Sequence, residues 1–324
     1  MTTATHWHDR PEGGGHFAIW LIRNIALYCG RRAGRALLYP ITLYFYLRRG
    51  PERRASRSYL QRVSDGPVGA WQVMRHIHCF AATILDRVFL LAHGEKSFHI
   101  ETEGLDLLDA RLALGRGVLL LGSHQGSFEA LRAIGARRPQ MPLRVVLDKQ
   151  KTPAMTELLE ALSPEVGACV IDAARDGTSI ALAMAEACRA GAVVAMLADR
   201  GRAQEVLHRV DFLGSPAPFP ISPWLLANTL RVPVVLCFGL YLGGNRYRLV
   251  FEPYADRVEI PRHARQAALD TYIAGYARRV EHYIRVAPYN WFNFYDFWQQ
   301  ESAPALAVEP AAQPAADVGG RVAL

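Results

Sequence analysis

The stretch Val118-Leu-Leu-Leu-Gly-Ser-His-Gln-Gly-Ser-Phe-Glu129 decides how this chain folds. Its four leading apolar residues are typical of a strand buried in the middle of a sheet. The Gly and Ser residues that follow indicate a turn, and residues 128–136 predict a helix that begins there. In open α/β sheets, binding and catalytic groups gather at such junctions, where the strands end at their carboxyl edge. The stretch therefore predicts an α/β fold with a functional site near His124.

The remainder of the chain repeats this alternation. Short apolar runs predict further strands at residues 97–100, 143–147, 168–171, 193–197, 234–238 and 247–251. Apolar residues at helical spacing predict helices at residues 71–91, 154–162, 178–190, 223–230 and 262–286. Because strands that alternate with helices pair in parallel, we expect one mostly parallel sheet flanked by helices.

Four parts are expected along the chain. Residues 1–16 contain three consecutive glycines and predict a flexible lead, whereas residues 301–324, rich in Ala, Pro and Val, predict a disordered tail. Residues 17–60 predict a helical segment associated with a membrane, and residues 61–300 predict the catalytic α/β domain.

The membrane prediction rests on charge and hydropathy in the first part. Of the net charge of +7, residues 1–62 carry +8, from eleven Arg and three acidic residues, and the remainder carries −1. The apolar runs at 17–22, 25–28 and 36–47 are shorter than the roughly 18–20 residues of a spanning helix. Apolar helices flanked by Arg lie in the membrane interface, where Arg contacts anionic head groups. We therefore expect an interfacial anchor, with two helices packed on the protein's own core as the alternative.

Other binding functions have less support in the sequence. No recognition motif accompanies the Arg-rich stretch, so nucleic-acid binding is not expected. His76 and His78 lack a well-spaced third ligand, since Asp86 is poorly placed for one, and a structural role is favoured over a metal site. The five Cys residues are scattered in apolar surroundings without a CxxC spacing, which indicates reduced thiols on the cytoplasmic side.

His124 is the best candidate for a proton acceptor, because imidazole titrates near neutral pH. Glu129 follows about one helical turn later and would hold the ring through its other nitrogen. The backbone N–H groups of Gln125, Gly126 and Ser127, at the expected start of a helix, would face a developing oxyanion. The surrounding sequence does not fit the GxSxG elbow of hydrolases, so no Ser nucleophile is expected.

Four blocks occur in an order that resembles one known superfamily. They are Ser123-His-Gln-Gly-Ser-Phe-Glu129, Val166-Gly-Ala-Cys-Val-Ile-Asp172, the strand from Ala190 that ends in Asp199-Arg200-Gly201, and Val232-Pro-Val-Val-Leu236. They are similar, in turn, to N-H-x-x-x-x-D/E, to G-x-x-F-I-x-R, to a strand followed by E-G-T-R or D-Q, and to V-P-V-x-P. Over residues 70–300 the chain resembles the lysophospholipid/glycerolipid acyltransferase superfamily, and within it the bacterial lipid A late (lauroyl/myristoyl) acyltransferase branch.

The resemblance implies an O- or N-acyltransferase on the cytoplasmic face of an inner membrane. It would move an acyl chain from an acyl carrier protein or CoA thioester to a lipid or glycolipid hydroxyl or amine, with no other cofactor and no metal. His124 would be the general base and Glu129 its orienter. Arg200 would hold an anionic group of a substrate, oriented by Asp199, with a mutual ion pair of the two at the strand end as the alternative. The residues expected to contact the substrates are Ser123, Gln125, Gly126, Ser127, Lys149, Arg175, Asp199 and Arg200.

Departures from the family pattern bear on the acceptor. Ser123 stands where the family has Asn, and Ala173 stands where its second block has Arg, which argues against glycerol 3-phosphate. The ending from Pro288 to Trp298 is aromatic rather than basic, and it looks more like branch members associated with aryl-polyene lipids. The candidate acceptors are therefore a lipid A-like molecule, an aminolipid and an aryl-polyene lipid. The aromatic ending is expected to pack against the sheet, with an acyl-tunnel wall or an interfacial belt as the alternative.

Two other functions stay open. An esterase or thioesterase could use a similar sheet and would release product without an acceptor alcohol. A membrane-bound scaffold with the same fold would neither cleave a thioester nor bind an acyl chain.

Overall fold

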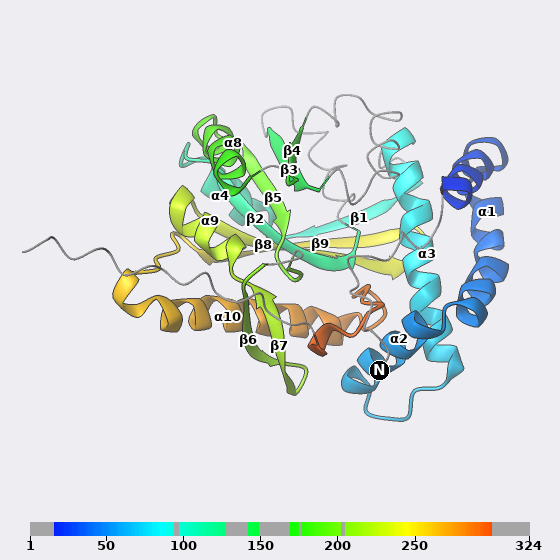
Figure 1. Ribbon diagram of the computed structural model, residues 1–324. Helices are drawn as coiled ribbons and strands as arrows, with labels where there is room; N and C mark the ends of the chain where they lie inside the picture. The colour runs from blue at the N-terminus through cyan, green and yellow to red at the C-terminus, as the bar shows by residue number, and fades with distance from the viewer. Residues whose placement is uncertain are drawn as a thin grey trace, which may run out of the picture.

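The computed structural model describes residues 16–93, 97–127, 142–148, 169–174, 176–201 and 205–299, with side chains described from residue 30 to residue 90 in the first of these ranges (Figure 1). Within these residues, seven strands form the main sheet in the order β1-β9-β8-β2-β5-β3-β4. Neighbouring strands are parallel except for β8 and β9, which form an antiparallel pair. The predicted α/β fold with a mostly parallel sheet is confirmed. The strands are β1 (His99–Glu103), β2 (Val118–Gly126), β3 (Leu143–Leu147), β4 (Val170–Asp172), β5 (Val193–Leu197), β8 (Val234–Gly243) and β9 (Arg246–Ala255).

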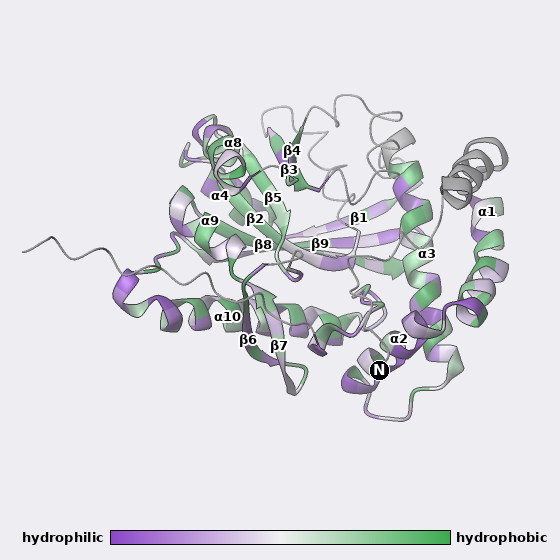
Figure 2. Ribbon diagram, viewed as in Figure 1, coloured by the Kyte–Doolittle hydropathy of each residue, from purple (hydrophilic) through white to green (hydrophobic). Residues whose placement is uncertain are grey.

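Helices cover both faces of this sheet. The described helices are α1 (His16–Arg48), α2 (Gly50–Val63), α3 (Ala70–His93), α4 (Leu105–Leu112), α8 (Gly177–Arg189), α9 (Ser222–Leu230) and α10 (Arg265–Val286), with short 3₁₀ turns at η3 (Arg262–Ala264) and η4 (Phe297–Gln299). One core contains side chains of α8, α9 and α10, and the other contains side chains of α1, α3 and α4. Leu119 and Leu121 of β2 enter the first core, while Val118 and Leu120 enter the second. Burial on both faces explains why the central strands are almost wholly hydrophobic (Figure 2).

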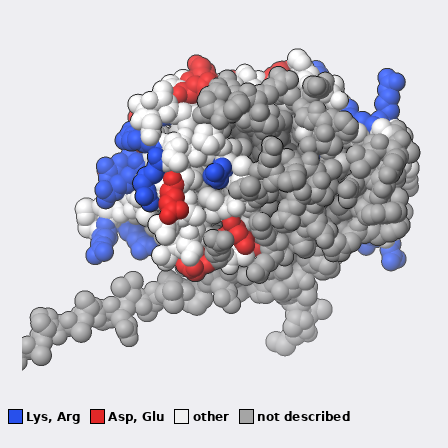
Figure 3. Space-filling view, turned by 90° about the horizontal axis from the view of Figure 1, so that it is seen from above, with Lys and Arg blue, Asp and Glu red and all other residues white. Residues whose placement is uncertain are grey.

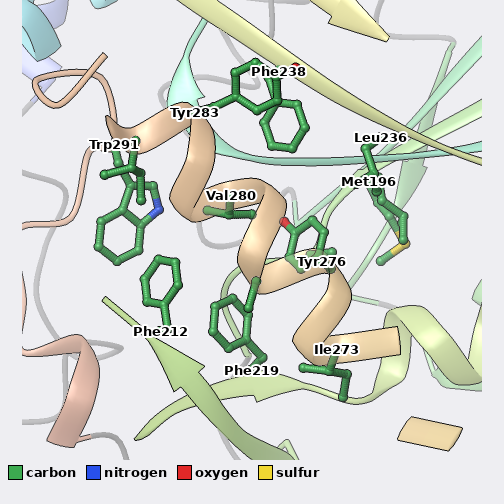
Figure 4. Close-up of a cluster of buried hydrophobic side chains, with 14 of the residues drawn as sticks. Met196, Phe212, Phe219, Leu236, Phe238, Ile273, Tyr276, Val280, Tyr283 and Trp291 are labelled. Carbon is green, nitrogen blue, oxygen red and sulfur yellow. The ribbon is translucent and has the colours of Figure 1, made fainter. Parts of the chain in front are cut away.

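The larger core packs α10 against the sheet and against a hairpin that the sequence reading missed. This hairpin consists of β6 (Leu207–Phe212) and β7 (Ser215–Pro220), which pair antiparallel. Its three prolines are unfavourable in a strand, since Pro cannot donate to a sheet ladder, so the sequence pattern does not reveal it. Figure 4 shows Phe212 and Phe219 of the hairpin beside Tyr276 and Val280 of α10. The Tyr276 hydroxyl also donates to the Gly122 carbonyl at 2.7 Å, so this core supports β2 directly before His124.

The N-terminal helix α1 is anchored on α3 by a buried ion network. Figure 1 shows the two helices side by side at one end of the molecule. Asp86 of α3 is fully buried and accepts from Arg31 Nε at 2.8 Å, from Arg31 Nη2 at 3.0 Å and from the Tyr247 hydroxyl at 2.9 Å. Arg35 lies 3.4 Å from the same carboxylate. A buried carboxylate without partners would cost several kcal/mol, so these donors hold α1, α3 and β9 together.

Helix α1 breaks at Gly30, whose φ of 76° and ψ of 169° lie outside the helical region. A left-handed φ of this kind favours Gly, which explains why the break falls there. Among the residues that the structure describes, no helix is at once long and apolar enough to cross a bilayer.

His76 has structural partners, as its sequence setting favoured. Its ring bonds to Ser56 Oγ at 2.8 Å and to the Trp291 carbonyl at 3.0 Å, and it is fully buried. Burial lowers the pKa of His76 to about 4. This effect of burial is larger than the opposing effect of the bond to the Trp291 carbonyl. The ring is therefore neutral at physiological pH and joins α2, α3 and the C-terminal segment.

Candidate functional site

The site lies at the carboxyl edge of the sheet, where the neighbouring strands β2 and β5 end. Their register pairs Gly122 with Leu197. Two residues further along each chain, the same register brings His124 opposite Asp199. The fold thus places side chains 75 residues apart in the sequence within direct contact, at the edge where α/β sheets bind ligands.

Asp199 holds His124 at two points. The carboxylate Oδ1 lies 2.7 Å from His124 Nδ1, and Oδ2 accepts from the His124 backbone N–H at 3.0 Å. Because an ionised carboxylate only accepts, Nδ1 carries the proton in this contact. In the neutral ring, Nε2 is then the unprotonated nitrogen. The His124 side chain retains 36% of its exposure, whereas Asp199 has none.

The charges around this pair favour an ionised Asp199 and a neutral His124. Burial by itself would raise the pKa of Asp199, but the contact with His124 and the nearby Arg200 outweigh it and hold the pKa below its usual range. Burial lowers the pKa of His124, and the positive charges of Arg200 and Arg87 add to this, against the opposing effect of Asp199. His124 can therefore accept a proton at neutral pH.

Arg200 lies next to the pair but is not its closest partner. Its Nε is 3.9 Å from Asp199 Oδ2, while Nη2 donates to the Phe292 carbonyl. Its guanidinium also lies over the Tyr295 ring, 5.3 Å from the centroid. The sequence prediction that Asp199 orients Arg200 thus describes a weaker contact. The shorter bonds of Asp199 go to His124.

The aromatic C-terminal segment, residues 288–298, closes over the end of β2. Phe292 N donates to the His124 carbonyl at 3.0 Å, and Gly126 N donates to the Asn290 carbonyl at 2.8 Å. The Asn290 side chain bonds both the N–H and the carbonyl of Tyr241, which ties the segment to β8. Trp291 is fully buried in the larger core and bridges to Gln125 of β2, so the predicted packing against the sheet is confirmed for it. A role of this segment as an acyl-tunnel wall or an interfacial belt stays a prediction.

The backbone amides proposed to face an oxyanion are engaged inside the fold. Strand β2 continues through Gly126, and the amides of Gly126 and Ser127 donate to the carbonyls of Asn290 and Gly239, each at 2.8 Å. The expectation that these two N–H groups are available to an oxyanion is therefore wrong. Gly126 has a φ of 59°, and a Cβ there would collide with the Gly239 carbonyl oxygen, so only Gly permits this close approach.

The other sequence candidates divide into two groups. Ser123 Oγ donates to Gln125 Oε1 at 3.2 Å, and both side chains are buried. Ser127 is also buried, and its hydroxyl has no partner within the part of the chain that the structure describes. A direct substrate contact by these three residues stays a prediction. Glu129, Lys149 and Arg175 lie outside the described residues, so their expected roles also stay predictions.

Sequence reasoning missed the pairing of His124 with Asp199 and the contribution of Trp291. Trp291 Nε1 donates to Asp199 Oδ2 at 3.0 Å. A signal for the pairing was present, because two apolar strands both run directly into polar residues at their carboxyl ends. No comparable signal pointed from Trp291 to Asp199, since 92 residues separate them.

Comparison with protein families gives a match. A family model described as bacterial lipid A biosynthesis acyltransferase matches residues 79–300. This range includes the strands of the main sheet, His124, Asp199 and the C-terminal segment. No curated protein matches the chain.

Proposed function

Because the chain belongs to the bacterial lipid A biosynthesis acyltransferase family, we propose that it transfers an acyl chain from a thioester to a lipid. The donor is an acyl carrier protein or CoA thioester. The acceptor is a hydroxyl or an amine of a lipid or glycolipid, either lipid A-like, an aminolipid or an aryl-polyene lipid. One observation carries the proposal, namely that Asp199 holds His124 through Nδ1 and leaves Nε2 as the acceptor of a proton.

In the proposed reaction, His124 Nε2 takes the proton of the acceptor O–H or N–H as that atom attacks the thioester carbonyl carbon. The new C–O or C–N bond forms, a tetrahedral intermediate collapses, and the C–S bond breaks. The proton on Nε2 then passes to the departing thiolate sulfur. Asp199 keeps the Nδ1 proton in place and stabilises the transient imidazolium, because its carboxylate stays ionised beside the ring. No enzyme nucleophile is needed, since a thioester is already activated.

Arg200 is the proposed contact for an anionic part of a substrate, a phosphate of the acceptor or of the carrier arm. Its position beside His124 supports this role, and a guanidinium binds phosphate through several N–H groups at once. Its bond to the Phe292 carbonyl fixes the guanidinium at the site. Glu129, Lys149 and Arg175 remain proposed members of the same site from the family resemblance.

We place the protein on the cytoplasmic face of an inner membrane, with α1 as its interfacial anchor. Four large residues of α1, Tyr39, Leu43, Tyr44 and Leu47, are between 50% and 69% exposed and share one side of the helix. The opposite side already packs on α3 through Leu38. In Figure 2 the described part of α1 carries hydrophobic residues although it stands at the outer edge of the molecule. An exposed apolar stripe of this kind suits the boundary between head groups and acyl chains.

Exposed basic residues on α1 and on the following helix α2 suit an anionic bilayer surface. Arg32 and Arg48 of α1, and Arg54 and Arg57 of α2, are exposed. Charge alone does not select this surface, because Figure 3 shows arginines gathered at another edge of the molecule as well. The coincidence of the apolar stripe with these arginines favours α1 and α2 as the side that faces the lipid.

Replacing Leu43 and Leu47 together by Glu is expected to weaken binding to anionic phospholipid vesicles by at least ~10-fold, since each buried Leu contributes about 1.5 kcal/mol or more. Co-flotation with vesicles containing phosphatidylglycerol measures this. The matched control is Leu182→Glu on α8, because Leu182 is also exposed, at 56%. Equal binding by both variants would contradict the docking surface.

The reaction itself is tested with purified protein, acyl-CoA or acyl carrier protein thioesters, and a total membrane lipid extract. We expect mass spectrometry to show a lipid whose mass has increased by one acyl chain, at the expense of the thioester. Release of free acid at the same rate with and without lipid would identify a thioesterase instead. An intact thioester under all conditions would favour the scaffold.

A further inference from the structure

Three N–H groups converge on the buried carboxylate of Asp199. Oδ1 accepts a hydrogen bond from His124 Nδ1 at 2.7 Å. Oδ2 accepts from both the His124 backbone N–H and the Trp291 indole N–H, each at 3.0 Å. Among the described residues, the indole is thus the one hydrogen-bond donor to this carboxylate that does not belong to His124. It is also fully buried, so no solvent competes for its N–H.

The indole of Trp291 is itself held on all sides. Its ring meets Tyr59, Phe212 and Phe297 edge-on, with centroid distances of 5.1, 5.4 and 5.1 Å. The backbone carbonyl of Trp291 accepts from His76 Nε2 at 3.0 Å. Figure 4 shows the indole close to the hairpin residue Phe212. Contacts from α2, α3, the hairpin and the C-terminal segment therefore fix the direction in which its N–H points.

We propose that Trp291 is a positioning residue, whose indole N–H holds the Asp199 carboxylate in the plane that presents Oδ1 to His124 Nδ1. The part of this proposal that concerns turnover rests on the acyltransferase function proposed above. The part that concerns the geometry of Asp199 and His124 does not depend on it.

The physical reason is the small number of contacts that orient a carboxylate. Without the indole N–H, Oδ2 keeps one hydrogen bond, from the His124 backbone N–H, beside the longer 3.9 Å contact with Arg200 Nε, and rotation about the Cβ–Cγ bond of Asp199 is less restrained. The carboxylate also loses a bond that shares its charge, which is the stronger kind of hydrogen bond in a buried setting. A more basic carboxylate attracts the Nδ1 proton more strongly, so the protonated form of His124 becomes more favourable.

Trp291→Phe tests this, because it removes the N–H and retains an aromatic ring. We expect kcat to fall by about tenfold with little change in KM, since the indole is fully buried and acts through Asp199. We also expect the pKa of His124 to rise, as seen in the NMR titration of histidine ring signals and in the acidic limb of the pH–rate profile. The groups that face His124 and remain unchanged are Asp199, Arg200 and Arg87. The His124 signal is assigned by its loss in a His124→Gln sample.

Trp224→Phe is the matched control. Trp224 is also fully buried, and its indole nitrogen has no partner within the described residues. The same substitution there alters packing but removes no bond to a carboxylate. If Trp291→Phe gives the His124 pKa and the kcat of this control, the proposal is overturned.

A second measurement reads the bond directly. In Asp199→Asn, the indole N–H resonance of Trp291 should move upfield, because a neutral amide is a weaker acceptor than a carboxylate. An unmoved resonance would contradict the bond. Both NMR measurements remain decisive in a protein that transfers no acyl chain, so failure of the proposed function and failure of the positioning role are told apart.

Discussion

His124→Gln is expected to lower the rate of acyl transfer by about 10³-fold, within the 10²–10⁴-fold that a positioned general base usually contributes. Gln has no group that can take up the proton of the acceptor near neutral pH. The loss should appear in kcat, because the acceptor would still bind but would attack with its proton in place. Transfer rates with a saturating thioester donor measure this. The Gln amide can donate to the buried Asp199 carboxylate in place of His124 Nδ1, so the substituted protein should remain folded.

The matched control for this substitution is His263→Gln. His263 is exposed in the turn η3 before α10, away from the carboxyl edge of β2. It should retain the wild-type rate. A His124→Gln protein that transfers acyl chains as fast as this control would remove His124 from the mechanism.

The pH dependence of the wild-type rate tests the same role of His124 as a base. His124 acts as a base only when it is neutral, and its pKa lies below the ordinary value, first because of burial and then because of Arg200 and Arg87. The acidic limb of kcat/KM should therefore fall below pH 6.5, the ordinary value for His. Removing the charge with Arg200→Gln should move that limb to higher pH.

The fold could be predicted from the sequence largely because burial on both faces leaves a simple pattern. The apolar runs at residues 143–147 and 193–197 coincide with β3 and β5. The hairpin from Leu207 to Pro220 was missed, because its prolines hide strands that pack on α10 through Phe212 and Phe219. Local composition describes a strand with prolines poorly when tertiary packing decides its conformation.

The candidate site was only partly predictable for a different reason. The sequence predicts a candidate site at His124, since its place after a buried strand is a local feature. Its partner Asp199 is distant in the sequence and comes close to it only in the folded sheet, through the register of β2 and β5. The sequence reading paired His124 with Glu129 because helical spacing can be counted along the chain, whereas the register between strands cannot.

Contacts between distant segments also decide which amides are available. The N–H groups of Gly126 and Ser127 looked suited to an oxyanion as long as a helix was expected to begin there. In the structure they donate to Asn290 and Gly239, from two segments more than 100 residues away. Any oxyanion donor must therefore come from elsewhere around His124.

Asp199→Asn is expected to lower kcat by about 10³-fold or more, through the tautomer of His124. Asp199 accepts from three N–H groups, two of them at Oδ2, but an Asn offers only one acceptor oxygen. The amide oxygen is best placed where the His124 backbone and Trp291 both donate. Its NH₂ group then faces Nδ1, which must give up its proton to accept from it. The proton moves to Nε2, and the base is blocked.

Two further variants are compared with Asp199→Asn. Asp86→Asn changes a second acid that is fully buried in the described part of the chain, in the network that anchors α1, and should reduce stability without blocking His124. Glu129→Gln tests the orienter expected from the family motif. If Glu129 held the imidazole during the reaction, its variant would show the larger loss in kcat and Asp199→Asn would stay within about tenfold of the wild type. The bond of 2.7 Å from His124 Nδ1 to Asp199 leads us to expect the reverse order, because one ring nitrogen can donate its single proton to only one carboxylate at this distance.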